Sequence, residues 1–574
     1  MSTANNDARL SIAAPRSLSA VLDYAAARNR RAAAVLLVFS LIAFLPGFFQ
    51  IPPVDSDEAR FAQATKQMLE SGQYVDIRFQ DEVRYKKPVG IYWLQAVAVK
   101  AGETVGIPRA HTTIWLYRLP SLFGAIGAVL LTYWTALAFV TRRSALLAAL
   151  MMASSVLLGV EARLAKTDAV LLLTCVAAMG AMARIYLTCR RAPEREIGWR
   201  QPAILWTALA AGVMIKGPLI LMFVGLAAIT LSIVDRSGGW IWKLRPFAGL
   251  VWLLVLVLPW FAAIIAKSGD SFFVQSVGED MLAKVFGGQE AHGAPPGLYF
   301  VLFWVTFWPG SILAGLAAPR IWQARREDGT RFLLAWLIPS WIVFEMVITK
   351  LPHYVLPLYP AIAILIAGVL EGGGLSTNRW LLRGTAGWFA FPAIISILVI
   401  VGFMMIGHEP GFAAWPFAAA AAIAGLFAWR LYEVDGPERS LLRGMVTSVL
   451  VALTVYGVMF PSLPALFPSA MVADTLRAGD CGKPKVASTG YYQEPSLVFL
   501  LGTETRFTDG AGAAEFLAKG SCRFALIDAR SERSFVQRGQ AIGLHYALGS
   551  RVEGYNISIG RPVALTIFRS TEKP

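Results

Sequence analysis

The sequence has 574 residues, of which 56% are hydrophobic and only 16% are charged. A soluble protein of this length carries about 25% charged residues, so the composition excludes an ordinary soluble protein. The formal net charge is +15, but the basic residues stand in short segments between long apolar runs. There they orient a membrane protein, and we expect no nucleic-acid partner.

The first apolar run begins near Ala32, directly after a basic tail with Arg28, Arg30 and Arg31. No small-residue cleavage site follows this run, so the pattern predicts a membrane span rather than a signal peptide. Later runs at residues 220–234, 250–266 and 388–406 contain no charged residue. Such runs are typical of transmembrane helices.

Basic segments recur along the chain and predict its topology, because loops rich in Lys and Arg stay in the cytoplasm. Two crossings between neighbouring segments, followed by a last span at residues 445–460, predict about thirteen spans. The N-terminus is then cytoplasmic and the C-terminus external. The segments lie at residues 28–31, 142–143, 190–200, 236–245, 320–331, 379–383 and 430–443.

One apolar stretch, residues 89–99, is cut short by Lys100 and Glu103. It is too short to span a bilayer, and counting it as a span would place the later basic loops outside. We therefore predict one long external loop at residues 51–118, with amphipathic helices along the membrane surface.

The composition changes after residue 468, where apolar runs shorten and Gly, Ser, Asp and Glu become common. Short strands are predicted at residues 484–487, 496–501, 524–527 and 563–568, and a helix at 511–519. The predicted fold is a polytopic α-helical membrane domain at residues 32–467, preceded by a cytoplasmic tail at 1–31 and followed by a small external α/β domain at 468–574.

Carboxylates at the outer ends of two spans are the catalytic candidates. Asp57 and Glu58, with Arg60 close by, precede a predicted helix at residues 59–71, and the positive end of a helix favours negative charge. Asp168 lies in the second external loop with Arg163. A solvated loop start is the alternative for an acidic pair, but ionisable residues beside apolar runs are functional candidates. Asp55, two residues before Asp57, is expected to tolerate substitution.

External lysines form a second set of candidates. Lys86 and Lys87 follow Tyr85, and Lys350 closely precedes His353 and Tyr354. The remaining candidate is Lys284. Each lysine alone could be an interfacial anchor. Several lysines on the external face favour an anionic partner, and a lipid phosphate is the obvious one. No P-loop or GxGxxG motif is present, and nucleotide sugars are absent outside the cell, which favours a carrier-lipid donor.

At these residues the chain resembles the bacterial aminoarabinose transferases. They belong to the GT-C superfamily, which also includes the protein O-mannosyltransferases. The resemblance covers residues 32–470, and its most specific stretch runs from Lys350 through the following Leu-Pro-His-Tyr to residue 360. Further matching segments begin at Asp57, Met68, Tyr85, Arg118, Arg163, Lys216 and Leu258.

The resemblance implies a GT-C fold and an enzyme that moves a sugar from undecaprenyl phosphate to lipid A at the periplasmic face of the bacterial inner membrane. The sugar implied is 4-amino-4-deoxy-L-arabinose. The essential aspartates of the family map to Asp57 and Asp168, and its phosphate-contacting lysine maps to Lys87. Two positions differ: Lys86 replaces a common Glu, and Lys284 is the nearest cation to a common Arg. No cofactor is assigned. A divalent metal stays open as an alternative, although the ligand spacing does not support one.

Other functions stay open at this point. The donor could carry galacturonic acid or a hexose, and the acceptor could be a protein or polysaccharide. From another class, a transporter or flippase for a lipid-linked sugar would also have many spans and external charges. Transporters usually show inverted repeats, and the sequence shows none. The expected partners are the lipid-linked donor, lipid A or another envelope acceptor, and membrane lipids.

Cys481 and Cys522 are predicted to form a disulfide. Each precedes a predicted strand, and neighbouring parallel strands would bring both strand starts to the same sheet edge. The alternative is a pair of free thiols.

Overall fold

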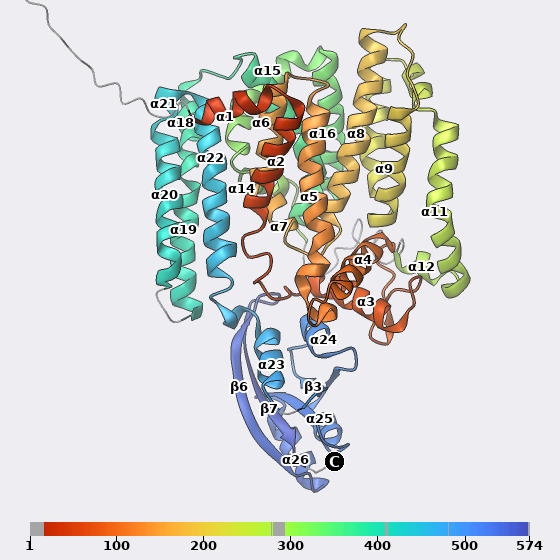
Figure 1. Ribbon diagram of the computed structural model, residues 1–574, viewed down its shortest axis with the longest axis vertical. Coiled ribbons are helices and arrows are strands. Elements are labelled where there is room, and N and C mark those ends of the chain that lie inside the picture. Colours follow the sequence, from red (N-terminus) through yellow and green to blue (C-terminus); the bar gives the residue numbers. More distant parts are fainter. Residues whose placement is uncertain (1–16, 277, 279–292, 408–410, 480, 572–574) are drawn as a thin grey trace, which may run out of the picture.

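The computed structural model describes residues 17–276, 278, 293–407, 411–479 and 481–571, and it divides them between a helical bundle and a small domain of strands and helices. Figure 1 shows the small domain projecting from one end of the bundle. We call this end the sheet end, and the opposite end, where α1 lies, the far end.

The bundle contains helices of very different lengths and one short hairpin in the loop after α2. Its helices are α1 (Ser17–Ala26), α2 (Asn29–Phe44), α3 (Asp57–Ser71), α4 (Gly90–Thr104), α5 (Ile114–Ala136), α6 (Arg142–Ser154), α7 (Val156–Glu161), α8 (Asp168–Arg191), α9 (Arg200–Lys216), α10 (Leu219–Val234), α11 (Pro246–Ser268), α12 (Ser271–Phe273), α14 (Leu298–Thr306), α15 (Ser311–Gln323), α16 (Asp328–Met346), α17 (Tyr359–Glu371), α18 (Arg379–Gly387), α19 (Phe391–Gly402), α20 (Trp415–Arg430), α21 (Tyr432–Asp435) and α22 (Pro437–Ala452), and its hairpin strands are β1 (Arg78–Phe79) and β2 (Glu82–Val83).

Seven helical segments of the described chain are long and apolar enough to cross a membrane. Asp168–Arg191 is largely buried inside the bundle, whereas Pro246–Ser268 leaves most of its apolar residues on the outside, where lipid can cover them. The helical polytopic fold expected from the sequence is confirmed, and the number of about thirteen spans stays a prediction. The seven segments are Ile114–Ala136, Asp168–Arg191, Pro246–Ser268, Pro352–Glu371, Arg379–Gly407, Phe412–Arg430 and Pro437–Met459.

The chain between α2 and α5 forms the predicted long loop at the sheet end. Its helices α3 and α4 lie at that end, next to the small domain (Figure 1). The apolar stretch 89–99 falls within α4, which has 15 residues and is not among the seven long segments. The helix predicted at 59–71 begins two residues earlier, at Asp57.

The small domain contains a five-stranded sheet of strand order β4-β3-β5-β7-β6. β3 is parallel to β4 and β5, while β7 is antiparallel to β5 and β6. Leu526 of β5 packs with α23 and α24, whereas Ala525 and Ile527 pack with α25 and α26. Helices therefore cover both faces of the sheet, as in other α/β layers. The elements are α23 (Pro468–Arg477), β3 (Lys485–Thr489), α24 (Pro495–Leu501), β4 (Arg506–Thr508), α25 (Gly510–Leu517), β5 (Arg523–Asp528), α26 (Glu532–Ala541), β6 (Tyr546–Asn556) and β7 (Arg561–Ser570).

One predicted strand of this domain is wrong. Residues 496–501 form helix α24, which begins with Pro495 in its first turn. A short apolar run cannot be assigned to strand or helix by periodicity alone, and proline in the first turn favours a helix start. The strands predicted at 484–487, 524–527 and 563–568 are present as β3, β5 and β7, and the helix predicted at 511–519 is α25.

Cys481 and Cys522 form a disulfide with their Cα atoms 5.6 Å apart. Lys485 of β3 is paired in parallel with Arg523 of β5, so both cysteines precede strand starts at the same sheet edge. The bond joins residues 41 positions apart, and the chain-entropy model gives it about 4 kcal/mol of stabilisation.

The small domain contacts the bundle through α24. Ser496 donates its backbone N–H and its hydroxyl to the carboxylate of Asp55, at 2.9 and 2.6 Å. The buried ammonium of Lys66, on α3, donates to the carbonyl oxygen of Phe499 at 2.8 Å. The Phe499 ring also meets the edge of Tyr117, with ring centroids 5.2 Å apart. The domain is thereby fixed to the helix that begins at Asp57.

Asp55 is therefore part of this contact, and its expected tolerance to substitution is wrong. Burial, and then the neighbouring Glu494, raise the pKa of Asp55 from 3.8 to about 7. Between about pH 4 and pH 7 the folded protein keeps a proton that the unfolded chain has lost, so stability falls as the pH rises through this range. We expect the thermal midpoint of the purified protein to fall between pH 5 and pH 7, and Asp55→Asn to lose this part of the pH dependence. An unchanged pH slope in the variant would contradict the assignment.

Candidate active site

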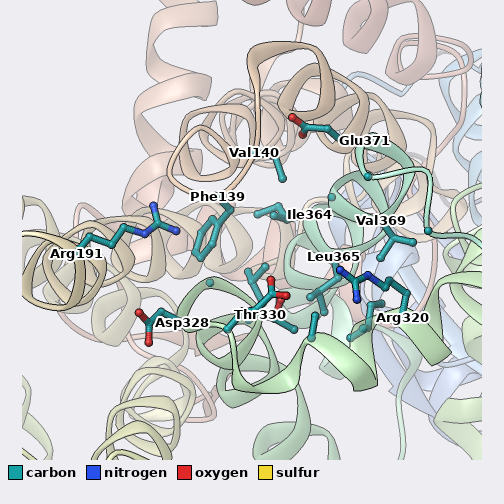
Figure 2. A pocket seen from close by; sticks show the side chains of 18 residues that line it. Phe139, Val140, Arg191, Arg320, Asp328, Thr330, Ile364, Leu365, Val369 and Glu371 are labelled. Carbon is teal, nitrogen blue, oxygen red and sulfur yellow. The ribbon is translucent and has the colours of Figure 1, made fainter.

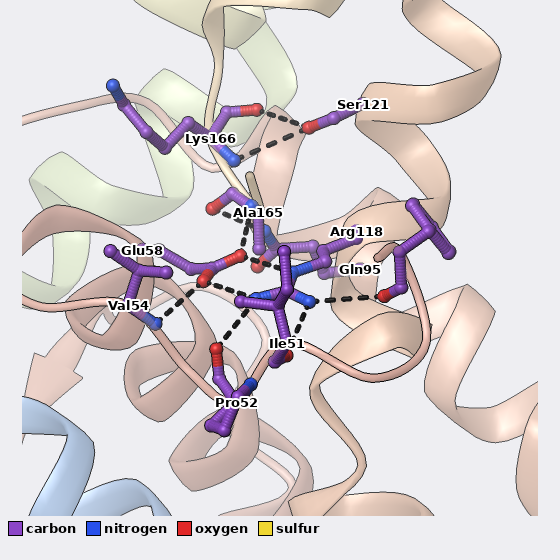
Figure 3. Close-up of polar contacts among 10 residues, drawn as sticks. Ile51, Pro52, Val54, Glu58, Gln95, Arg118, Ser121, Ala165 and Lys166 are labelled. Atoms are coloured by element: carbon purple, nitrogen blue, oxygen red, sulfur yellow. Dashed lines mark hydrogen bonds and ion pairs between the residues drawn. The ribbon is translucent and has the colours of Figure 1, made fainter. Parts of the chain in front are cut away.

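A buried ion pair between Glu58 and Arg118 organises the loops at the sheet end (Figure 3). Arg118 Nε donates to Glu58 Oε1 at 2.7 Å, and Nη2 donates to Oε2 at 2.8 Å. Both side chains are 1% exposed. The other guanidinium hydrogens bind the carbonyl oxygens of Phe48, Ile51 and Pro52. All five N–H groups of Arg118 are thus used, as burial of the charge requires.

Glu58 also binds two loops directly. Its Oε2 accepts the backbone N–H of Val54 at 2.9 Å, and its Oε1 accepts that of Ala165 at 2.8 Å. The carboxylate therefore joins the loop after α2, α3, α5 and the loop between α7 and α8. Glu58, a catalytic candidate from the sequence, holds its neighbour Asp57 and this second loop in place.

Two further hydrogen bonds fix the backbone of the second loop. Gln95 of α4 donates to the carbonyl oxygen of Ala165 at 3.2 Å. Ser121 of α5 donates to the carbonyl oxygen of Lys166 at 3.0 Å, as Figure 3 shows. The side chains on either side of these carbonyls are consequently held at defined positions.

Beside this loop lies a buried group of five ionisable residues, which we call the charge cluster: Glu161, Lys166, Asp168, Lys216 and His353. Lys166 Nζ lies 3.5 Å from Glu161 Oε1 and 3.9 Å from Asp168 Oδ2. Lys216 Nζ is hydrogen-bonded to Asp168 Oδ1. His353 lies between the carboxylates, with Nδ1 3.6 Å from Glu161 Oε1 and Nε2 3.7 Å from Asp168 Oδ1.

The five side chains come from separate elements that end or begin at this level. Glu161 ends α7, Asp168 begins α8, and Lys216 ends α9. Lys166 lies in the loop between α7 and α8, and His353 lies in the segment before α17. The position of Asp168 at a helix start suits its negative charge. Functional side chains are thus anchored on rigid helices.

The electrostatic field around Lys166 connects the charge cluster with Asp57. Burial alone would lower the pKa of Lys166, but Glu161, Asp168 and Asp57 together raise it above its usual value. Burial also raises the pKa of Glu161 above its usual value, against the effect of Lys166. Asp57 itself is partly buried at the first position of α3. The two aspartates singled out from the sequence therefore both act electrostatically on one ammonium group, and Asp168 lies 3.9 Å from it.

The Lys-Pro motif approaches the same place from α4. Lys87 is partly buried and stands three residues before Gly90, the first residue of α4. A Cβ atom at Gly90 would lie only 2.6 Å from the carbonyl oxygen of Met214, so the two backbones touch. Met214 is two residues from Lys216. The contact places the Lys87 segment beside the end of α9.

Tyr85 supports the first loop instead of joining the charge cluster. Its hydroxyl donates to Asp76 Oδ1 at 2.7 Å, and its ring packs against Phe272 with centroids 5.7 Å apart. Burial, and then the hydrogen bond to Asp76, raise the pKa of Tyr85 to about 12. The phenol is therefore neutral, and its hydroxyl is occupied by the structural hydrogen bond to Asp76.

Lys350 binds backbone carbonyl groups at the end of α16. Its buried ammonium donates to the carbonyl oxygen of Glu345 at 2.9 Å and to that of Val347, and it lies 5.9 Å from the Tyr299 ring centroid. A cation near a helix C-terminus is favourable. These contacts account for the buried position of the Lys350 ammonium without a bound phosphate.

Arg163 is likewise a structural residue. Its Nε donates to the carbonyl oxygen of Pro46 at 2.8 Å, and its other nitrogens bind the carbonyls of Ala43 and Gly159. The guanidinium also lies 4.3 Å from the ring centroid of Tyr456. Arg163 therefore binds the end of α2 to α7.

The remaining candidates lie around the cluster or outside the described residues. Tyr354 packs edge-on against His353, with centroids 5.1 Å apart, and Lys216 Nζ lies 5.3 Å from its ring. Arg60 is partly exposed and acts electrostatically on Asp55. Lys284 lies outside the described residues.

Within the described chain, Glu161, Asp168 and His353 form the one group of potential metal ligands, with ligand atoms within 4.8 Å of one another. The ammonium groups of Lys166 and Lys216 contact the same carboxylates. A divalent cation would have to displace both ammonium groups and bear their repulsion. This donor set fits an ion-pair network better than a resident metal.

Sequence reasoning did not select four of the residues that build this site. Three of them, Glu161, Lys166 and Lys216, are ionisable residues at the ends of apolar spans. The same feature made Asp168 a candidate. Arg118 carried a different signal, a single charge inside an otherwise apolar span. Only the tertiary structure shows that their side chains converge.

Comparisons with known proteins show what the chain is similar to in sequence and fold. The family model of dolichyl-phosphate-mannose-protein mannosyltransferases matches residues 34–268. The undecaprenyl phosphate-alpha-4-amino-4-deoxy-L-arabinose arabinosyl transferase of Erwinia tasmaniensis is 28% identical over 422 residues, or 68% of this chain and 72% of that protein. The protein of the same name from Pseudomonas aeruginosa is 28% identical over 455 residues, or 75% of this chain and 76% of that one.

A solved structure is similar over nearly the whole fold. ArnT from Cupriavidus metallidurans bound to undecaprenyl phosphate has a TM-score of 0.72 and covers 93% of this chain and 96% of that one, at 19% identity. Its apo form has a TM-score of 0.69. The bundle and the small domain are thus arranged as in ArnT.

These findings first indicate a class by similarity: the chain has the polytopic helical fold of ArnT and is similar in sequence to glycosyltransferases named for lipid-phosphate sugar donors. Within that class the chain is similar in sequence to the arabinosyl transferases described above and in fold to the two ArnT structures.

Proposed function

We propose that this chain transfers 4-amino-4-deoxy-L-arabinose from undecaprenyl phosphate to lipid A at the periplasmic face of the bacterial inner membrane. The observation that carries the proposal is the buried charge cluster beside Asp57, at the end of the bundle that the small domain covers. The names of the curated relatives support the donor and the sugar, and the basic loops support the orientation.

The site offers what the transfer chemistry needs. An acceptor oxygen attacks the anomeric carbon, the bond from that carbon to the phosphate oxygen breaks, and the electron pair leaves with the carrier phosphate. Fixed cations stabilise the phosphate as its charge develops. We assign this task to Lys87, which the resemblance implies as the phosphate-contacting lysine, and to Lys216, which lies in the charge cluster. Tyr85 lies outside the cluster, and Lys350 binds the backbone at the end of α16.

The two aspartates have different tasks in this proposal. Asp168 holds the ammonium of Lys216 in position. Asp57 orients the acceptor and accepts its proton if the acceptor is a hydroxyl group. A lipid A phosphate is already ionised and needs little deprotonation, so with this acceptor Asp57 acts by positioning.

The division of labour between domains is also part of the proposal. Residues 32–467 form the catalytic membrane domain, and residues 468–574 form a periplasmic domain that braces the start of α3. The hydrogen bonds from Ser496 to Asp55 support this role, since Asp55 is two residues from Asp57. A periplasmic position also suits the disulfide, because that compartment is oxidising.

Reconstituted transfer tests the proposal directly. The purified chain in liposomes should move the aminoarabinose from its undecaprenyl phosphate carrier to added lipid A. The same liposomes with galacturonic acid or a hexose on the carrier should give little product. Transfer of either of those sugars at the same rate, or no transfer of the aminoarabinose, would contradict the donor assignment.

Lys87→Ala is expected to weaken donor capture by about 1.5–3 kcal/mol, the value of a hydrogen bond to a charged group. The KM for the donor should rise roughly tenfold to a hundredfold. Steady-state kinetics in the same liposomes measure the change.

Lys100→Ala is the matched control, because Lys100 is an exposed lysine of α4, the helix that follows Lys87. Its KM should stay near the wild-type value. If Lys87→Ala lowers only thermal stability and leaves the donor KM unchanged, Lys87 is an interfacial anchor rather than a phosphate ligand.

A further inference from the structure

A cavity of about 420 Å³ lies at the far end of the bundle, where α15, α16 and α17 meet the end of α8 (Figure 2). α8 runs 24 residues from Asp168 in the charge cluster to Arg191 at this cavity. A helix of that length spans about 36 Å. The cavity is therefore a separate place from the candidate active site.

Charges of both signs line this cavity. Arg191 and Arg320 lie on opposite sides of it, and Glu371 lies near its edge (Figure 2). Among the described residues neither Arg320 nor Glu371 has an ion-pair partner, although Glu371 Oε2 accepts the backbone N–H of Thr141 at 3.2 Å. The stem of Arg320 packs against Gly374, where a Cβ atom would lie 2.9 Å from its Cγ. An unpaired cation and an unpaired anion thus line one cavity.

An apolar groove of about 510 Å³ adjoins the cavity. Ile321 and Leu365 line both spaces. The groove runs between α14, α15, α16 and α17 and is lined only by apolar and tryptophan side chains. A polar cavity that continues into an apolar groove matches an amphiphile, with its headgroup in the first space and an acyl chain in the second.

We propose that the cavity and groove together bind one membrane phospholipid whose zwitterionic headgroup carries a primary ammonium. Its phosphate binds Arg320, its ammonium binds Glu371, and an acyl chain fills the groove. The bilayer supplies this ligand directly. Glu371 ends the helical segment Pro352–Glu371, which begins beside His353, so the lipid braces the segment that leads to the charge cluster.

Lipid retention by the purified full-length chain tests the site. The protein is titrated in detergent with phosphatidylethanolamine, phosphatidylcholine or phosphatidylglycerol of identical acyl chains, and bound lipid is counted by native mass spectrometry. We expect phosphatidylethanolamine to be retained about tenfold better than the other two. Phosphatidylcholine has no N–H to donate to Glu371, and phosphatidylglycerol has no ammonium.

Three variants separate the contributions. Arg320→Gln should lower retention of phosphatidylethanolamine about tenfold by removing a phosphate ligand. Ala318→Trp should lower it as well, by filling the groove without a change of charge. Arg383→Gln is the control, since Arg383 is an exposed arginine of α18 outside the cavity, and retention should be unchanged.

Four outcomes would overturn the proposal. They are equal retention of the three lipids, stronger retention of phosphatidylglycerol, wild-type retention by Arg320→Gln, and displacement of the lipid by an equal concentration of soluble phosphoethanolamine. The last outcome would show that the groove contributes nothing.

Discussion

Asp57→Asn should reduce transfer by roughly 10²- to 10⁴-fold while the protein remains folded in the membrane. Asparagine keeps the size of the side chain but cannot accept the proton of an acceptor hydroxyl or carry the charge next to Lys166. Because the Asp57 side chain is only partly buried, the substitution should change the free energy of unfolding little. Turnover in reconstituted liposomes and thermal unfolding of the same preparation measure the two effects.

The matched control is Asp81→Asn, an exposed carboxylate in the same long loop. Its turnover should equal that of the wild type. Asp55 is unsuitable as a control because it binds Ser496. Near-normal turnover of Asp57→Asn would remove this residue from the mechanism.

Arg118→Gln should destabilise the protein by about 3–5 kcal/mol, the cost of leaving one member of a buried ion pair without its partner. Glu58 would keep its two backbone donors, from Val54 and Ala165, but would lose the guanidinium. Activity should fall as well, since the same pair fixes the start of α3 and the loop before Asp168. Thermal unfolding of the purified variant measures the stability loss.

A double-mutant cycle isolates the pair itself. Glu58→Gln combined with Arg118→Gln should be more stable than Arg118→Gln alone, because no unpaired charge stays buried. If the two single effects simply add, the ion pair is not the source of the stability.

The membrane architecture could be predicted from the sequence because it follows from composition and from local patterns. Apolar runs and basic loops are read one segment at a time, and the short run before Lys100 is assigned to a loop helix by its length and by the placement of the later basic loops. The disulfide followed from two strand starts, at Lys485 and Arg523. These inferences need no knowledge of which helices are neighbours.

The site was predicted less completely, because its geometry depends on long-range packing. Asp57 and Asp168 are the catalytic candidates from the sequence, yet their surroundings depend on residues far away in sequence. Arg118 binds Glu58, the neighbour of Asp57, and Lys216 binds Asp168. Lys350 and Arg163 looked equally functional in sequence, but their donors bind backbone carbonyls. The position of a charged residue near a span end does not show whether its side chain binds backbone carbonyls at a helix terminus or a ligand.

The contact between the two domains was also beyond sequence reasoning. Asp55 resembles a solvent-exposed loop residue until Ser496, 441 positions later, donates two hydrogen bonds to it. Phe499 of α24 likewise packs against Tyr117 of the bundle. No local pattern carries that information.

Mass spectrometry of lipid A tests the central claim most directly. Lipid A is extracted from bacteria that lack this chain, from the same strain with the wild-type chain, and from the strain with Asp57→Asn. We predict a 4-amino-4-deoxypentose increment on lipid A in the wild-type sample and none in the other two. Identical lipid A in all three samples would contradict the proposed transfer.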